Sequence, residues 1–133
     1  MGAWDATSFG NDAANDWAYD LRDSNDLSFI NATLQNLLIA GDADIGTRDS
    51  EKAIAAAEVV AWLLGRPSAT NAYTQKVATW VATHPIQPPP ATIQKALAVL
   101  DRVECEPSSL LELWDGDSDW VAAIAALRTR LSP

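Results

Sequence analysis

Residues 53–64 read Ala53-Ile54-Ala55-Ala56-Ala57-Glu58-Val59-Val60-Ala61-Trp62-Leu63-Leu64. Only Glu58 interrupts this apolar run, which is the longest in the chain. In a helix with 3.6 residues per turn, these apolar side chains cover nearly every face. A helix that is apolar all round is buried in a protein core, and the run is shorter than the roughly 18 apolar residues of a membrane span. We therefore expect this segment to be the central helix of the fold.

Glu58 is the one charged residue in that helix. Its neighbours three and four positions away are all apolar, and burying an unpaired carboxylate is costly. The side chain therefore either reaches a solvent cleft, where it would be a candidate acid or base, or accepts hydrogen bonds from buried donors. We favour the second interpretation, with the donors being backbone amides of a docked loop formed by residues 2–8, or a tryptophan N–H.

The apolar spacing on both sides of this segment is helical, and no stretch shows sustained alternation typical of strands. The sequence therefore predicts an all-α protein, a single compact bundle of about six to seven short helices. An ordered N-terminal segment is expected to pack on the central helix. The predicted helices are Asp12 to about Leu21, Leu27–Leu38, Glu51–Leu64, Tyr73 to about Thr83, Ile93–Val103 after a proline run, Ser109–Trp114, and Asp117 or Ser118 to Leu131.

Capping residues mark the expected helix ends. Asn11 is placed to cap the first helix, Asp49 or Ser50 the central one, and Ser109 the short sixth one. Gly65 follows the central helix, at the position where glycine commonly ends helices in a left-handed conformation. These signals fix where the helices begin and end along the chain.

Six tryptophans are many for 133 residues, and Trp4 and Trp17 lie near the start of the chain. Chain ends are usually poorly ordered unless they are packed, so aromatic residues there indicate a segment held against the core. All six fall at helical-stripe or motif positions, which favours core packing; a ligand pocket lined by them is the alternative. Trp114 and Trp120, which flank an acidic turn, are expected to be partly exposed.

The formal net charge is −9, and the acids gather at the two ends of the sequence. Residues 1–50 hold nine acids and two bases, residues 51–100 two acids and four bases, and residues 101–133 seven acids and three bases. Nucleic acids and anionic membrane surfaces need basic partners, so neither is expected as a ligand. A basic protein would be compatible. The residues expected to form an acidic interaction surface are Asp20, Asp23, Asp26, Asp115, Asp117 and Asp119.

Motifs for metal or cofactor chemistry are lacking. One histidine and one cysteine cannot make a zinc ligand set. The acidic stretches that begin at Asp42 and Asp115 lack the glycine and glutamate of a calcium loop. There is no nucleophile elbow and no glycine-rich phosphate loop. We therefore predict no metal and no cofactor, and enzymatic activity is not favoured, since any catalysis would have to rest on carboxylates. The absence of a secretory signal pattern favours a cytoplasmic location.

The opening Met1-Gly2-Ala3-Trp4, followed by Phe9, Asn11-Asp12, Ala14 and Asp16-Trp17, resembles a bacterial family known as domain of unknown function 4259. Residues 55–60 and the segment from Ser109 to Leu131 are similar to the family as well. Asp5 stands where its members typically carry glycine. The resemblance implies one helical domain over residues 1–133, and it brings no catalytic residues, because none are established for the family. The residues singled out as structural or ligand-anchoring are Trp4, Asn11, Asp12, Asp16, Trp17 and Glu58.

Three functions remain open from the sequence. The first, which the charge favours, is a non-enzymatic acidic interaction module, for example an immunity-like protein that neutralises a basic toxin or nuclease, or a regulatory protein. The second is a small-ligand binder or a carboxylate-dependent enzyme centred on Glu58. The third is a structural subunit of an assembly. The sequence leaves the oligomeric state open.

Overall fold

Helix α3, Thr47–Leu63, is the buried centre of the protein. In a computed structural model, which describes residues 5–133, every side chain from Ala53 to Trp62 is buried. The described chain is all-α, as predicted, with no strand among its elements. The other elements are α1 (Asp12–Leu21), α2 (Ser28–Leu38), the 3₁₀ helix η1 (Ala72–Thr74), α4 (Gln75–Thr83), α5 (Pro90–Val103), α6 (Ser109–Trp114) and α7 (Ser118–Leu131).

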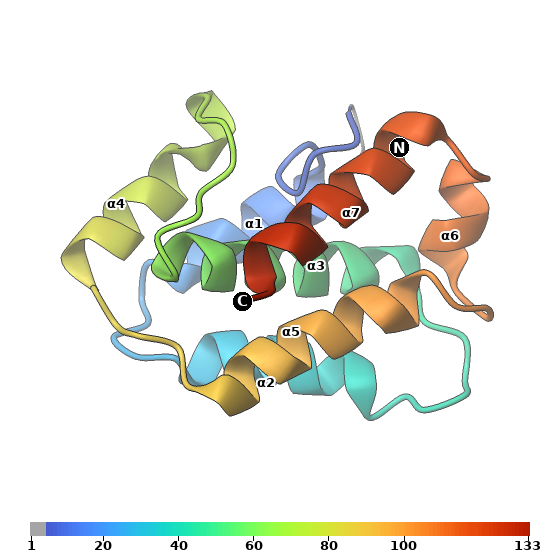
Figure 1. The fold of residues 1–133 in the computed structure, drawn as a ribbon, viewed down its shortest axis with the longest axis horizontal. Coiled ribbons are helices and arrows are strands. Elements are labelled where there is room, and N and C mark those ends of the chain that lie inside the picture. Colours follow the sequence, from blue (N-terminus) through green and yellow to red (C-terminus); the bar gives the residue numbers. More distant parts are fainter. Residues whose placement is uncertain (1–4) are drawn as a thin grey trace.

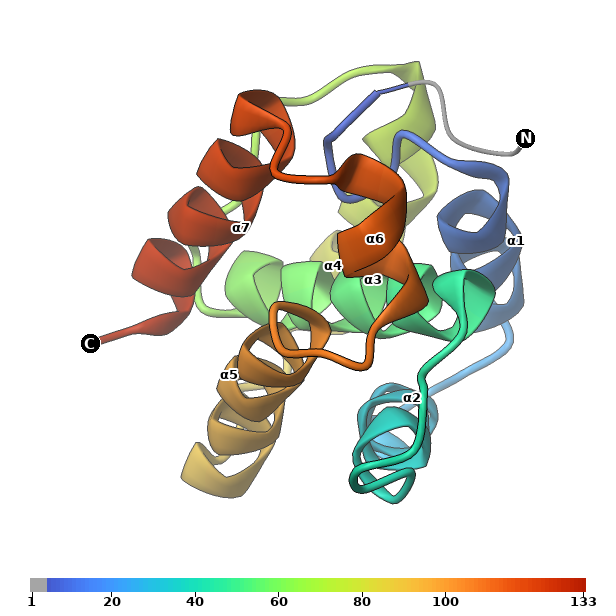
Figure 2. The same ribbon diagram turned by 90° about the vertical axis from the view of Figure 1, so that its right-hand side faces the viewer.

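The remaining helices surround α3. Figure 2 shows α1 and α2 on one side of α3 and α5 and α7 on the other, while Figure 1 shows α4 and α6 at opposite ends. Helix α3 contacts each of the other six α-helices. Its alanine-rich surface explains this, because a small side chain lets neighbouring helices approach closely on several faces. Within residues 5–133, no helix has both the length and the apolar character that a bilayer crossing requires.

The helix ends agree in part with the capping residues expected from the sequence. The Asn11 side chain accepts a hydrogen bond from the amide of Ala14 at 2.7 Å, which confirms this cap. The expected start of the central helix is wrong, because α3 begins at Thr47 and Asp49 and Ser50 lie within its first turn. The cap of α6 is Ser108, which accepts from the Leu111 amide, and not Ser109.

The C-terminus of α3 ends as the glycine predicts. Gly65 has a φ of +81°, a conformation that a side chain would strain. Its amide donates to the carbonyl of Trp62, and the next amide, that of Arg66, donates to the carbonyl of Ala61. These two bonds form a Schellman motif, which satisfies carbonyls that the helix end leaves open. The turn places Arg66 beside the end of α7.

The described part of the N-terminal segment packs on the core. Phe9 is buried in the main hydrophobic cluster, and Ala6 packs against that cluster. Trp4 lies outside the described residues. Trp114 and Trp120, beside the acidic turn, were both expected to be partly exposed, and this is confirmed for Trp114 only. Trp114 is partly buried, but Trp120 is only 3% exposed because it lies on the buried face of α7 with Ile124 and Leu127, so its expected exposure is wrong.

Candidate interaction site

Glu58 is paired inside the core and is only 1% exposed. The guanidinium of Arg130, from the last turn of α7, donates through Nη1 to Oε2 and through Nη2 to Oε1, the latter at 2.9 Å. The hydroxyl of Ser8 donates to the same Oε1 at 2.9 Å. A bidentate pair between arginine and a carboxylate is the strongest geometry for such contacts. Both carboxylate oxygens are therefore occupied by protein donors.

These partners differ from the expected ones. Ser8 belongs to the loop predicted to reach Glu58, but it donates through its hydroxyl and not through a backbone amide. The Trp62 indole N–H is buried and has no hydrogen-bond acceptor among the described residues, so it is not the donor. The sequence did not identify Arg130 as the partner, because a basic residue near a helix C-terminus is already explained by its favourable interaction with the helix dipole.

The Glu58–Arg130 pair belongs to a larger connection between α3 and α7. Arg130 also donates to the carbonyl of Arg66 at 3.2 Å. In return, the guanidinium of Arg66 donates to the carbonyls of Arg130 and Ser132, at 3.0 and 2.5 Å. A cavity of about 210 Å³ borders Glu58, Arg130 and Ser8. This cavity supplies the space that a small-ligand site at Glu58 would need, although the carboxylate oxygens already have donors.

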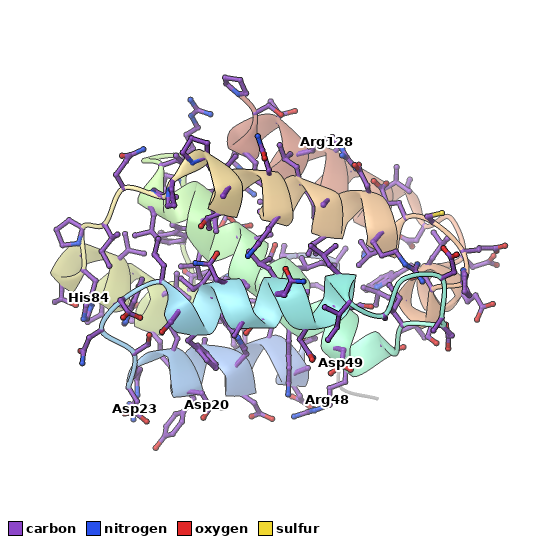
Figure 3. The ribbon with its side chains drawn as sticks, turned by 90° about the horizontal axis from the view of Figure 1, so that it is seen from below. Asp20, Asp23, Arg48, Asp49, His84 and Arg128 are labelled. Atoms are coloured by element: carbon purple, nitrogen blue, oxygen red, sulfur yellow. The ribbon has the colours of Figure 1, made fainter. Side chains whose placement is uncertain are left out.

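A row of carboxylates runs along α1. Asp12, Asp16 and Asp20 of α1 are exposed, and their spacing of four residues places the side chains on the same helix face. Asp23, just after the end of the helix, is exposed as well. Asp16 forms an exposed ion pair with Arg48 at 2.9 Å. Figure 3 shows Asp20, Asp23, Arg48 and Asp49 on the side of the molecule that carries α1 and the start of α3. The structure thus places Asp49 of α3 on the same side of the molecule as the acidic face of α1.

Asp26 lies in the turn between α1 and α2 and is exposed. Its carboxylate accepts from the hydroxyl and the amide of Ser28, at 2.6 and 2.9 Å. These hydrogen bonds stabilise the charged form and hold the pKa of Asp26 below its ordinary value. Asp26 therefore keeps its negative charge over a wide pH range.

A groove of about 350 Å³ lies between α1, α2 and the first turns of α3. Asp20 and Asp49 line it from two different helices, and no ion pair joins either carboxylate to a described residue. Trp17 and Phe29 also line the groove, with their rings stacked at 5.3 Å between centroids. Lys52 is the one base in the lining, so carboxylates outnumber it two to one.

Hydrogen bonds hold the aromatic part of this groove in place. The indole of Trp17 donates to the hydroxyl of Thr33 at 2.8 Å, and that hydroxyl donates to the Phe29 carbonyl at 3.0 Å. The side chains of α1 and α2 are therefore tied together beneath the carboxylates. Such a site, with an aromatic wall and two unpaired carboxylates, matches the chemistry of a lysine or arginine side chain.

The second acidic cluster, at α6 and α7, is used in part for capping. The Asp117 side chain accepts from the amides of Asp119 and Trp120, at 2.9 and 3.2 Å. Asp115 follows α6 with a φ of +47°, in the left-handed region that ends helices. Asp115 and Asp119 are exposed. No group of three or more His, Cys, Asp or Glu side chains in residues 5–133 is arranged to hold a metal ion.

The structure does not bring the predicted anchor residues to one place. Asn11, Trp17 and Glu58 line three different cavities, and Asp12 and Asp16 are exposed on α1. Sequence reasoning missed Asp49 as a groove residue because the same aspartate also fitted a helix cap. An earlier start of α3 would have revealed Asp49. An aspartate inside the first turn of a helix is not needed as the cap, so its side chain can contact other groups.

Comparison with known families gives one finding. The model of the family described as "Domain of unknown function (DUF4259)" matches residues 2–125. The chain belongs to this family. No curated protein and no solved structure matches the chain. The DUF4259 match includes the acidic groove and Glu58, and it ends before Arg130.

The DUF4259 description assigns no activity, so the function has to be argued from the side chains themselves.

A second carboxylate, besides that of Glu58, is buried in α3. Glu51 of α3 is 8% exposed, and it borders a cavity that also touches Asn11 and Trp120. No described residue forms an ion pair or hydrogen bond with its carboxylate. Burial raises the pKa of Glu51 from its ordinary value of 4.5, although the nearby Arg48 opposes the shift and Asp12 adds to it.

Glu51→Gln is expected to stabilise the protein near neutral pH. Because the folded-state pKa is raised, the folded protein holds this proton longer than the unfolded chain, so stability falls as the pH rises above 4.5. The neutral amide avoids this loss, and the melting temperature near pH 7 should increase by about 2–4 °C.

Thermal unfolding over a pH series measures this effect. The gain should shrink as the pH falls through 4.5, because wild-type Glu51 then becomes protonated in both states. Glu106→Gln, on an exposed residue, is the matched control and should leave the melting temperature unchanged. A melting temperature of Glu51→Gln below that of the wild type at pH 7 would show that the charge has a partner.

Proposed function

We propose that this protein is a non-enzymatic interaction module that binds a basic protein through the acidic face of α1. The groove between α1 and α2 would receive a lysine or arginine side chain of the partner. The observation that carries the proposal is the pair Asp20 and Asp49, two unpaired carboxylates from different helices that line one groove with a stacked aromatic pair. A cytoplasmic protein with an immunity-like or regulatory role is one form of this function.

Charge and chemistry support this proposal together. The excess of acids over bases, 18 against 9, would steer a basic partner towards the protein and raise the association rate. Within the groove, a guanidinium could pair with a carboxylate and lie against an aromatic ring, and both contacts strengthen where water is displaced. Exposed carboxylates on a helix are common and do not by themselves indicate a binding site. The groove adds a position where one basic side chain of the partner could bind.

The alternative function, a small-ligand binder or a carboxylate-dependent enzyme centred on Glu58, has less support. A cavity of about 210 Å³ does border this residue. However, Arg130 and Ser8 donate to both oxygens of its carboxylate. An external substrate would have to displace these donors, which would break the connection between α3 and α7.

A titration with a synthetic lysine- and arginine-rich peptide tests the proposal. We expect binding near pH 7 in about 50 mM salt that weakens strongly in about 300 mM salt, where the Debye length is shorter. Asp20→Asn/Asp49→Asn should lower the affinity about 10-fold or more, which corresponds to about 1.4 kcal/mol. Isothermal titration calorimetry measures both effects.

The matched control is Asp115→Asn/Asp119→Asn, which changes the net charge by the same amount at the other acidic cluster. This variant should bind within about threefold of the wild type. Equal losses in both double variants would mean that net charge alone attracts the peptide, and the groove would have no role. Absence of wild-type binding at low salt would overturn the proposal altogether.

A further inference from the structure

A second groove, of about 350 Å³, lies between the end of α1 and helix α4. Its lining contains three side chains that carry or can carry positive charge: Arg22, Lys76 and His84. No carboxylate is among its lining residues. This is unexpected in a chain with a net charge of −9, and in Figure 3 His84 lies at the α4 end of the molecule, far from Asp49.

The cations of this groove have no acidic partners. No ion pair joins Arg22 or Lys76 to a carboxylate within residues 5–133. Arg22 instead lies over the ring of Tyr19, with its guanidinium carbon 4.1 Å from the ring centroid. A guanidinium over an aromatic ring is positioned while its N–H donors stay available. The groove therefore holds cationic donors that are not used within the described structure.

His84 is held in one orientation. Its imidazole stacks on the indole of Trp80 at 4.7 Å between centroids, and Nδ1 lies 3.0 Å from the Trp80 carbonyl oxygen. The Thr83 hydroxyl also lies 3.0 Å from Nδ1, so Nδ1 either donates to the Trp80 carbonyl or accepts from this hydroxyl, according to the tautomer. No described residue forms a hydrogen bond with Nε2. The Trp80 indole is fixed in turn, since it donates to the Ser24 carbonyl at 2.9 Å.

Neutral donors complete the lining. The Thr79 hydroxyl donates to no described acceptor, and the Gln75 side chain has no hydrogen bond to a described residue, although both line the groove. Uncharged donors next to guanidinium and ammonium groups are the set that recognises a tetrahedral oxyanion. Arginine binds phosphate oxygens through two parallel hydrogen bonds, and lysine adds a point charge.

We infer that the groove between α1 and α4 is a binding site for a phosphate monoester of a small molecule, with Arg22 and Lys76 as the main phosphate contacts. His84, whose ring stacks on the buried Trp80, forms one wall, which the organic part of the ligand would cover. The site is separate from the acidic groove, and it does not depend on the proposed interaction with a basic protein.

The overall negative charge does not prevent anion binding at this position. Asp20 and Asp23 are close to Arg22 in the sequence, but neither lines the groove. At physiological salt the Debye length is about 8 Å, so exposed carboxylates further away are largely screened. The local contacts therefore dominate the affinity, which should be in the millimolar range typical of a few charged hydrogen bonds, about 4 kcal/mol.

Titration by ¹⁵N NMR at constant ionic strength tests the inference, with glycerol 3-phosphate, inorganic phosphate and uncharged glycerol as probes. We expect shifts of the amides in Gln75–His84 with both phosphates and none with glycerol. Tighter binding of glycerol 3-phosphate would identify an organic phosphate as the ligand. Equal affinity for both would contradict the monoester as the ligand, because the organic part would then add nothing to binding.

Variants separate this site from general charge effects. Arg22→Gln/Lys76→Gln should weaken phosphate binding about 10-fold or more. Arg48→Gln/Lys95→Gln makes the same change in net charge at positions that line neither groove, and it should bind as the wild type does. Equal binding by the two double variants, or no amide shifts in the wild type up to about 20 mM phosphate, would overturn the inference. Neither result would bear on the acidic groove, since Asp20 and Asp49 are intact in both variants.

Discussion

Arg130→Ala is expected to lower the free energy of unfolding by about 3 kcal/mol, because it leaves the Glu58 carboxylate buried without its main partner. Glu58 is 1% exposed, and after the substitution only the Ser8 hydroxyl would still donate to it. The side chain of Arg130 is 22% exposed, so water can enter beside the carboxylate. For this reason we expect the lower end of the usual range of about 3–5 kcal/mol. Urea denaturation measures the loss.

Two variants show whether the loss comes from the unpaired charge. Arg128→Ala removes an arginine from the same last turns of α7, where the partners Asp101 and Glu104 lie near the surface, and it should cost about 1 kcal/mol or less. Glu58→Leu/Arg130→Met replaces both charges by apolar groups, and it should be more stable than Arg130→Ala alone. If this double variant were the less stable of the two, packing and not the isolated carboxylate would explain the loss.

Trp17→Ala should destabilise the protein by about 3–5 kcal/mol, the usual cost of emptying a buried aromatic position. The indole is 3% exposed and stacks on Phe29. It also donates to the hydroxyl of Thr33, so the substitution removes both the ring contact and a hydrogen bond between α1 and α2. Thermal and urea unfolding, read by circular dichroism, measure the effect.

Trp17→Phe is the matched control, because it separates the ring contact from the hydrogen bond. It keeps a ring against Phe29 but loses the hydrogen bond to Thr33, so a smaller loss of about 1–2 kcal/mol is expected. If the proposed function is correct, this variant should still bind the basic peptide, because Asp20 and Asp49 are unchanged. A Trp17→Phe variant as unstable as Trp17→Ala would show that the hydrogen bond matters more than the ring.

The helices were predictable because their signals are local. The N-cap at Asn11 and the left-handed glycine at Gly65 depend on backbone groups within a few residues, and both were found where the sequence places them. The start of α3 was predicted too late. Asp49 and Ser50 are good caps, but Thr47 and Arg48 also adopt helical geometry when the segment packs against its neighbours, and tertiary packing overrides such weak local preferences.

The candidate sites were less predictable, since their residues come from distant segments. Glu58 could be recognised from its apolar surroundings, but its partner Arg130 is 72 residues away. Asp20 was placed on an acidic surface from charge alone, whereas the groove it forms with Asp49 and Phe29 depends on how α1, α2 and α3 pack. Spacing within one helix carries no information on these contacts.

The sequence alone determined an all-α chain, a central apolar helix and a carboxylate within it that needed partners. The helices follow from the periodicity of the apolar residues, and the need for partners follows from the high free energy of a buried, unpaired charge. Both effects are the same wherever the segment lies in the fold. Only the tertiary structure decided that Arg130 is that partner, and that carboxylates and cations gather in two separate grooves beside α1. The physical reason is that short-range hydrogen bonds and ion pairs depend on distances of a few ångströms, which are set by the packing of whole helices.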